Sequence, residues 1–335
     1  MGAKRTRRLR SADVFKDESL PLSVRRHDDH GPCGVHSHEF HELVVILAGH
    51  GLHIAGREQY RIEAGDVFVI RGQMAHGYGE TEGMRLVNIL FDPKRLRLPF
   101  GLAHDMPGYH ALFMVEPELR GRDRFRSRLR LGEEELAEAA GMIVMLQQEL
   151  ERRQPGYRFL ACSHLMRLIG FLSRCYSREA RPAERPLLRV GEVLSFIAQH
   201  YKEPLTLAQL ARVGRMSERS LVRAFRGALG QSPIEHVIRV RLSRASELLA
   251  RGDVRVTEAA FECGFNDSNY FSRQFRKVMG VSPREYRARH VESGIRPHHA
   301  RRTFQPCSAG AGPGYGVGGD IGPSRIRNRP GVWTS

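Results

Sequence analysis

The front part of the chain alternates short apolar runs with glycines and other turn residues. Between residues 22 and 90, runs rich in valine, isoleucine and phenylalanine occupy positions 41–48, 51–55, 59–62, 67–71 and 84–91. Runs of this length, separated by turn residues, are typical of strands. A series of many short strands predicts a small β-barrel or sandwich.

From residue 132 the spacing of apolar positions becomes that of helices. Segments 133–153 and 157–177 are predicted to be helical, and Gln154, Pro155 and Gly156 separate them, so we expect an antiparallel hairpin. Its apolar stripes usually form intramolecular core, but in this position they are also a natural dimer surface. The stripes consist of Leu136, Ile143, Leu146, Leu150, Leu165, Leu168, Ile169 and Leu172.

Composition shifts divide the chain further. Residues 178–186 contain Pro182 and Pro186 among charges and are predicted to be an interdomain linker, and the Gly-, Pro- and Arg-rich end is predicted to be disordered. The expected parts are a basic N-terminal arm (1–20), a barrel (21–130), a helical hairpin for dimerisation (131–177), the linker (178–186), a helical domain (187–290) and the disordered tail (291–335).

The charge of the chain is concentrated at its two ends. The net charge is +16, yet residues 11–185 are close to neutral, whereas residues 1–10 carry five basic side chains and residues 186–290 carry 18 basic and 10 acidic ones. A localised positive charge favours a nucleic-acid phosphate backbone as partner, although a solvated basic surface is the plain alternative.

Other features of the composition limit the class of protein. The sequence contains no apolar run near the roughly 20 residues that span a bilayer, and no apolar segment follows the basic N-terminus as in a secretory signal. We therefore expect a cytoplasmic protein without a membrane partner. Five widely spaced cysteines support neither a disulfide framework nor a zinc knuckle and are interpreted as reduced thiols. They are Cys33, Cys162, Cys175, Cys263 and Cys307.

The most specific signal is an internal repeat at an offset of 50 residues without a gap. Eight identities fall within a short window. The aligned pairs are Gly214 and Gly264, Arg223 and Arg273, Phe225 and Phe275, Arg226 and Arg276, Gly230 and Gly280, Ser232 and Ser282, Pro233 and Pro283, and Glu235 and Glu285.

Each repeat has the pattern of a helix-turn-helix unit, at 205–230 and 255–280. In the first unit Gly214 is expected to supply the permissive turn and Ser217 to cap the second helix, and Asp267 is the corresponding cap in the second unit. Apolar residues return at helical spacing to close each small core. These residues are Leu207, Leu210, Ala211, Leu221, Phe225 and Ala228 in the first unit, and Ala259, Ala260, Phe271 and Phe275 in the second.

After each unit a Ser-Pro-x-Glu run predicts a capping box and a new helix. The first of these helices, 233–250, is about 27 Å long at 1.5 Å per residue, which would hold two reading helices about one turn of B-DNA apart. We therefore expect both second helices to enter successive major grooves on one face of the duplex.

The residues that reach DNA should lie on the face opposite the phenylalanines. Arginine can donate twice to guanine and asparagine can pair with adenine. The expected base-contacting residues are Arg219, Ser220, Arg223, Ser268, Asn269 and Arg273. Residues further along each helix are expected to contact phosphate. These are Arg226, Arg276 and Lys277.

Residues 187–290 resemble the DNA-binding domain of the AraC/XylS family. The resemblance rests on the run Ala260, Gly264-Phe265, Tyr270-Phe271, Arg273, Phe275-Arg276-Lys277, Gly280, Ser282-Pro283 and Tyr286-Arg287. It implies two helix-turn-helix units joined by a rigid helix that bind asymmetric promoter sites, most often to activate transcription through RNA polymerase. Val222 departs from the family pattern, in which this position often holds a polar base-contacting residue.

A cluster of histidines marks the front domain. On a strand His36 and His38 point to one face, Glu42 keeps the same parity, and His76 from a later strand would complete a possible metal site. The spacing resembles the two cupin motifs, together with Gly49 and Gly65. Departures from the motifs are the position of Gly31, and Arg71 and Gln73 in place of proline and glycine.

Three interpretations of this cluster remain open: a metalloenzyme, a metal-dependent sensor, and a sensor whose polar residues hydrogen-bond an effector without metal. We assign no metal and no cofactor, no catalytic residue, and an effector-binding role to the cluster. The effector-binding residues are His36, His38, Glu42 and His76.

Residues 107–117 and 125–131 are similar to rhamnose-type sugar regulators of the family. The predicted fold class is α+β multidomain, with an N-terminal cupin-like β-barrel and helical hairpin and a C-terminal all-α tandem helix-turn-helix domain. The predicted function is a sequence-specific transcription regulator, an activator that responds to a small molecule such as a sugar. Its expected partners are double-stranded promoter DNA, the effector, RNA polymerase and a second copy of the chain. The alternative is a cupin-type metalloenzyme, such as a sugar isomerase or dioxygenase, with a basic tail.

Overall fold

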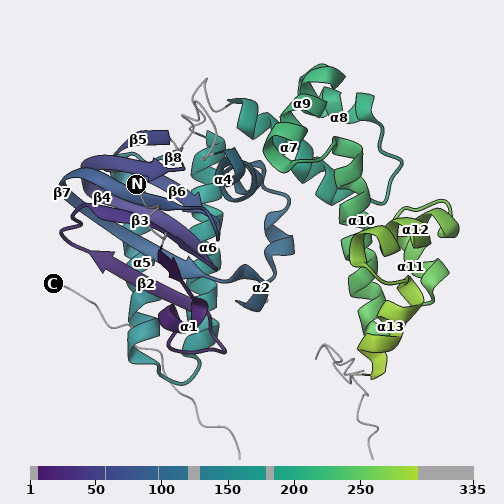
Figure 1. The fold of residues 1–335 in the computed structure, drawn as a ribbon, viewed down its shortest axis with the longest axis horizontal. Helices are drawn as coiled ribbons and strands as arrows, with labels where there is room; N and C mark the ends of the chain where they lie inside the picture. Colours follow the sequence, from purple (N-terminus) through teal and green to yellow (C-terminus); the bar gives the residue numbers. More distant parts are fainter. Residues whose placement is uncertain (1–6, 57, 97, 120–128, 179–184, 293–335) are drawn as a thin grey trace, which may run out of the picture. The chain divides into compact units, whose positions relative to one another are not determined.

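The computed structural model describes residues 7–56, 58–96, 98–119, 129–178 and 185–292 (Figure 1). The predicted tail, apart from residues 291 and 292, and most of the predicted linker lie outside these residues. The strands are β1 (Arg7–Leu9), β2 (Leu22–His27), β3 (Cys33–His38), β4 (His41–Ala55), β5 (Glu58–Glu63), β6 (Asp66–Ile70), β7 (His76–Phe91) and β8 (Leu129–Arg130).

Helices α1 to α4 are short elements of the front domain, and the remaining helices follow from residue 133 onward (Figure 1). The short ones are α1 (Ser11–Val14), α2 (Pro93–Leu96), α3 (Pro107–Tyr109) and α4 (Glu116–Leu119), with a 3₁₀ turn at Phe100–Ala103 and a π-helix at His110–Val115. The others are α5 (Glu133–Arg152), α6 (Tyr157–Arg178), α7 (Arg185–His200), α8 (Leu207–Val213), α9 (Glu218–Leu229), α10 (Pro233–Arg251), α11 (Val256–Glu262), α12 (Ser268–Met279) and α13 (Pro283–Glu292).

The eight strands form one sheet in the order β1, β3, β7, β4, β6, β8, with β2 added to β7 and β5 added to β4. The long strands β4 and β7 pair along almost their whole length, and the register shifts between Ile46 and Leu52. Two expectations are therefore wrong: β4 continues through the predicted break at 49–50, and β7 begins at His76 rather than Met84. The bulged pairing lets β4 change direction without ending.

Neighbouring residues of β4 serve two different cores. Leu43 and Val45 belong to a cluster that also contains the apolar residues of α5 and α6, whereas Val44 and Ile46 pack with Phe68 and other side chains on the opposite face. This is the alternation that the pleat of a strand imposes. The helical hairpin is confirmed, and its apolar stripes cover the sheet instead of lying open to a partner, because all eight residues belong to or pack against the first cluster.

The second half of the chain contains the two helix-turn-helix units, α8 with α9 and α11 with α12 (Figure 1). Ser217 caps α9 by accepting from the Ser220 backbone N–H, and Asp267 caps α12 by accepting from the N–H groups of Asn269 and Tyr270. Both helices end at a left-handed glycine, Gly230 or Gly280. The predicted caps are thus confirmed.

The two turns differ at their shared glycine. Gly264 has the expected positive φ of 84°, but Gly214 has a φ of −75° and the following residue, Arg215, is left-handed instead. The expectation that Gly214 supplies a permissive conformation is therefore wrong. This glycine provides space, because a Cβ there would lie 2.9 Å from Val193 Cγ2.

None of the helices among the described residues has both the length and the apolar character that crossing a membrane requires. The four cysteines among the described residues are free thiols, and Cys307 lies outside the described part.

Candidate sensor and DNA-reading sites

Helix α9 presents a basic face opposite its buried one. Leu221 and Phe225 are completely buried, and Arg219, Arg223 and Arg226 are exposed. Successive exposed arginines therefore follow the helix on the side away from its core. Within the part of the chain that the structure describes, none of these three guanidinium groups forms an ion pair.

Helix α12 repeats this arrangement. Phe271 and Phe275 are completely buried, while the outer face carries polar and basic side chains. Exposed on it are Asn269, Arg273, Arg276 and Lys277, and Ser268 is half-buried. The guanidinium carbon of Arg273 lies 6.0 Å from the ring centroid of Tyr270, which limits the directions that this arginine explores.

Ser220 differs from the other predicted base-contacting residues. It is half-buried, its backbone N–H donates to Ser217, and its hydroxyl accepts a 2.9 Å hydrogen bond from the Ser217 hydroxyl. The sequence pattern did not reveal this second contact, although a serine three residues after an N-cap serine is a recognisable signal. Ser220 thus takes part in the start of α9.

Arg226 and Arg276 occupy equivalent places beside the next helix. The backbone N–H and hydroxyl of Ser232 hold the pKa of Glu235 below its ordinary value, and Arg226 adds to this effect. Ser282 and Arg276 lower the pKa of Glu285 in the same way. Each arginine therefore lies where its helix meets the N-terminus of the following helix, further along the chain than the predicted base-contacting residues.

The second candidate site is a buried polar cluster of the front domain. His38 at the end of β3, Glu42 on β4 and His76 at the start of β7 are each at most 4% exposed. One oxygen of the Glu42 carboxylate, Oε2, lies 2.9 Å from His38 Nε2 and 3.4 Å from His76 Nε2. The structure therefore brings together three of the four predicted effector-binding residues around a single oxygen atom.

Backbone carbonyl groups orient these imidazole rings. Nδ1 of His38 lies 2.6 Å from the Phe40 carbonyl oxygen, and Nδ1 of His76 lies 3.2 Å from that of Met74. A carbonyl oxygen only accepts hydrogen bonds, so each Nδ1 carries a proton and each Nε2 faces the carboxylate. Burial raises the pKa of Glu42, but the hydrogen bonds and charge of His38 and His76 outweigh burial and hold this pKa well below its ordinary value.

The fourth predicted residue, His36, lies at the edge of the cluster. It pairs with His76 across β3 and β7, and the two ring centroids are 4.4 Å apart. His36 is half-buried, and its Nδ1 is 3.1 Å from the Gly34 carbonyl oxygen. Burial lowers the pKa of His36, and the neighbouring His76 lowers it further.

Two aromatic neighbours of this cluster were not predicted from the sequence. His53 on β4 is completely buried with its ring 5.9 Å from that of His76, and Tyr78 on β7 lies 5.3 Å from His53. Counting alternate residues from Glu42 puts His53 on the other face. The register shifts of β4 reverse this alternation, so the sequence pattern could not place His53 beside the cluster. Tyr78 could have been placed there, because it lies two residues after His76 on the same strand.

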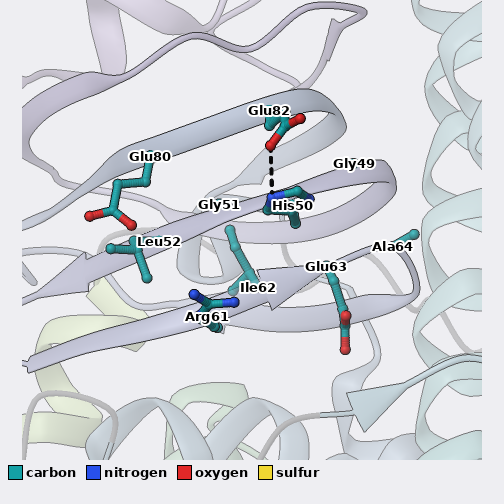
Figure 2. Close-up of a pocket in the computed structure, with 10 residues that line it drawn as sticks. All are labelled: Gly49, His50, Gly51, Leu52, Arg61, Ile62, Glu63, Ala64, Glu80 and Glu82. Atoms are coloured by element: carbon teal, nitrogen blue, oxygen red, sulfur yellow. Dashed lines mark ion pairs between the residues drawn. The ribbon is translucent and has the colours of Figure 1, made fainter.

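A hollow of about 760 Å³ is lined by residues of β4, β5 and β7 (Figure 2). Its polar side chains are exposed and mixed in charge, and His50 pairs with Glu82 at 3.3 Å. Glu63 is engaged by Arg130. His50 and Leu52 line the hollow from β4, whereas His53 is completely buried and belongs to the surroundings of the polar cluster.

A strand-rich domain with a buried polar cluster, followed by two helix-turn-helix units with basic outer faces, defines a ligand-responsive transcription regulator that binds DNA. Residues 22–169 match the family model described as the AraC-like ligand binding domain, and residues 210–289 match a helix-turn-helix domain model. The chain belongs to the AraC family of transcriptional regulators.

The chain is also similar to individual proteins of known name. The chain is 31% identical to the HTH-type transcriptional activator RhaR of Yersinia pestis bv. Antiqua (strain Angola), over 86% of this chain and 96% of that protein. It is 29% identical to the protein of the same name from Salmonella schwarzengrund (strain CVM19633), over 83% and 95%. Among solved structures, the DNA-binding domain of AdpA in complex with a target DNA is 32% identical over 32% of this chain and 96% of that chain, with a TM-score of 0.31.

Proposed function

We propose that this protein activates transcription from specific promoters when a small molecule, a sugar, binds its front domain. The observation that carries the DNA-binding part is the repeated basic face of α9 and α12, opposite completely buried phenylalanines. Because the basic side chains of these faces form no ion pair with any other described residue, their donors are available for bases and phosphates. The predicted contacts are bases for Arg219, Ser220, Arg223, Ser268, Asn269 and Arg273, and phosphates for Arg226, Arg276 and Lys277.

The DNA-binding part is tested on duplexes selected by the wild-type protein from a random library. We expect Arg223→Ala and Arg273→Ala each to cost about 1 to 3 kcal/mol at one operator position and little at others. Arg152→Ala, an exposed arginine on the helical hairpin, is the matched control and should bind like the wild type. Equal weakening on every sequence would assign these two arginines to phosphate contact, and unchanged binding would contradict the reading faces altogether.

The effector part rests on the ligand-binding domain and on the polar groups it holds. Sugars are recognised by convergent hydrogen-bonding side chains, which the cluster of His36, His38, Glu42 and His76 supplies. Because the other three are buried, His36 is the member that an entering molecule meets first. The relatives named RhaR are transcriptional activators, in line with the proposed sign of regulation.

Calorimetric titration with a panel of free pentoses, hexoses and deoxyhexoses tests the effector site. Binding that is lost in His36→Ala and kept in Arg61→Ala supports the cluster. The reverse result moves the effector to the hollow of Figure 2, which Arg61 lines. Transcription in vitro with purified RNA polymerase and the selected operator then tests activation, which should rise on addition of the sugar that binds.

We also propose that the hairpin mediates a homodimer, through a different surface from the predicted stripes. Those stripes pack in the domain core, but other apolar side chains of α5 and α6 are exposed, led by Phe159 at 76%. The other exposed ones are Val144, Met145, Leu160 and Met166. Phe159→Glu should lower the mass measured by sedimentation to that of a monomer. A protein that acts on promoter DNA in this way would work in the cytoplasm.

A further inference from the structure

We propose that His38, Glu42 and His76 bind a divalent transition-metal ion in the front domain. The possible ligand atoms of these three residues all lie within 4.8 Å of one another, and all three side chains are buried. They come from three different strands, β3, β4 and β7, so the sheet itself holds the ligands in place. This inference does not depend on DNA binding or on the identity of an effector.

The lone pairs of the two imidazole rings converge on one carboxylate oxygen. With Nδ1 of each ring bonded to a carbonyl oxygen, the neutral form of His38 or His76 has its lone pair on Nε2. Both lone pairs then face the same Glu42 oxygen, at 2.9 and 3.4 Å. Three acceptors without a donor between them repel one another inside a protein, where the dielectric screening is weak.

Protons can remove this repulsion, in full when both histidines carry one and donate to Glu42, and a dication that accepts the three lone pairs removes it as well. The two arrangements carry the same net charge, but the first confines two cationic rings, whose centroids are 5.1 Å apart, away from water. The second replaces both positive rings with one ion that bonds directly to all three groups.

Backbone carbonyl groups hold both imidazole rings from their outer side. A histidine that ligates a metal almost always donates its other ring nitrogen to a carbonyl or carboxylate, which fixes the tautomer and the ring orientation. The Phe40 and Met74 carbonyl oxygens serve His38 and His76 in this way. The rings are therefore already oriented with Nε2 inward, before any ion binds.

Size and donor type define the ligand. Ligand atoms about 2.1 Å from a tetrahedral metal are roughly 3.4 Å apart, close to the two separations from Glu42. The space among the three ligand atoms suits an ion, while a sugar would reach the cluster from the side of His36. Two imidazoles and a carboxylate suit Zn²⁺, Fe²⁺, Mn²⁺ or Ni²⁺ and are a poor set for Mg²⁺ or Ca²⁺, which prefer oxygen ligands only. His36, with its ring against His76, is placed to act as a further ligand.

The test uses the untagged full chain, stripped with EDTA and titrated with Co²⁺ and with Zn²⁺. We expect one ion per chain by elemental analysis and visible absorption bands for the Co²⁺ form. His38→Ala and Glu42→Gln should each weaken binding at least about 100-fold, as expected for loss of a ligand. His50→Ala removes an exposed histidine that also pairs with a glutamate, and it should bind the ion like the wild type.

Wild-type protein gives a second readout that no folding defect of a variant can disturb. The ¹⁵N shifts of His38 and His76 in the metal-free chain, and their change on addition of Zn²⁺, distinguish metal-bound rings from imidazolium rings. Imidazolium signals that Zn²⁺ leaves unchanged would overturn the proposal, as would equal loss of metal binding in His50→Ala. Retained DNA binding in the metal-free chain would leave the proposed function intact whichever way this test falls.

Discussion

Asp66 accepts a 2.9 Å hydrogen bond from Nε of Arg130 while its own side chain is completely buried. The two residues are register partners, Asp66 on β6 and Arg130 on β8, so the pair fastens the last strand to the sheet. The second carboxylate oxygen of Asp66 accepts from the backbone N–H of Glu63 at 2.9 Å. Because 26% of the Arg130 side chain is exposed, water can hydrate its charge, which reduces the loss of stability when Asp66 is replaced.

Replacing this aspartate should therefore destabilise the front domain. We expect Asp66→Asn to lower the free energy of unfolding by about 2 to 3 kcal/mol, somewhat less than for a completely buried ion pair. The exposed pair of Arg71 and Glu118 provides the control, and Glu118→Gln should cost at most about 1 kcal/mol. Urea unfolding of both variants measures the difference, and equal losses would show that burial of Asp66 is not decisive.

Two glycines of the DNA-binding half should respond to alanine in opposite directions. Gly264 has a φ of 84°, and a Cβ there would lie 2.6 Å from the Lys202 carbonyl oxygen. We expect Gly264→Ala to cost about 2 to 4 kcal/mol, through backbone strain and contact with rigid main chain. Gly227, in the middle of α9, has open space around its Cβ position, so Gly227→Ala should stabilise by about 0.5 to 1 kcal/mol. Urea unfolding that ranked the stabilities of the two variants in the opposite order would contradict both explanations.

The helix-turn-helix units were predictable because their signals are local. Ser217, Asp267 and the capping boxes at Ser232 and Ser282 act within three residues, and the repeat at an offset of 50 aligns α9 with α12 residue by residue. Gly214 shows the limit of such reasoning. A glycine stands at this position in both repeats, which suggests a turn conformation. The requirement for glycine comes instead from Val193, some 20 residues earlier, because a Cβ at residue 214 would be too close to its side chain.

The sequence predicted the elements of the front domain but not the register in which its long strands pair. Sequence pattern identified the sheet, the hairpin and three residues that meet in the cluster. It did not predict that β4 continues through Gly49 or that register shifts bring His53 to the buried side, because bulges depend on the partner strand. The first half of β7 was missed because its glycines and glutamates lack the usual apolar alternation.

Acid should destabilise the protein through His110, which is 3% exposed on the π-helix. Burial lowers the pKa of His110 to about 3, so the folded chain keeps the ring neutral where the unfolded chain protonates it. The stability linked to this ring is complete above the ordinary histidine pKa of about 6.5 and is lost as the pH falls from there toward 3. Between pH 7.5 and pH 5 the loss amounts to about 2 kcal/mol.

His110→Gln removes the titrating ring and keeps a donor for the His104 carbonyl oxygen, which Nε2 of His110 approaches at 3.0 Å. The free energy of unfolding of this variant should fall about 2 kcal/mol less than that of the wild type between these two pH values. His50→Gln, at an exposed histidine, is the control and should follow the wild type. Identical pH profiles for wild type and His110→Gln would exclude His110 as the source of acid sensitivity.

The cap of the second reading helix links stability to DNA recognition. Oδ1 of Asp267 accepts from the backbone N–H groups of Asn269, at 2.7 Å, and Tyr270, at 3.2 Å, so it orders the turn that carries the predicted base contact of Asn269. Asp267→Ala should cost about 1 kcal/mol of stability and speed amide exchange at these two residues. Asp267→Asn removes the same negative charge but keeps a capping oxygen, so it should stay close to the wild type in both measurements. Both variants lose the same negative charge, and this loss favours DNA binding equally in the two. Weaker operator binding by the alanine variant than by the asparagine variant would therefore show that an ordered start of α12 contributes to DNA recognition. Equal affinities would show that α12 reads DNA without this cap.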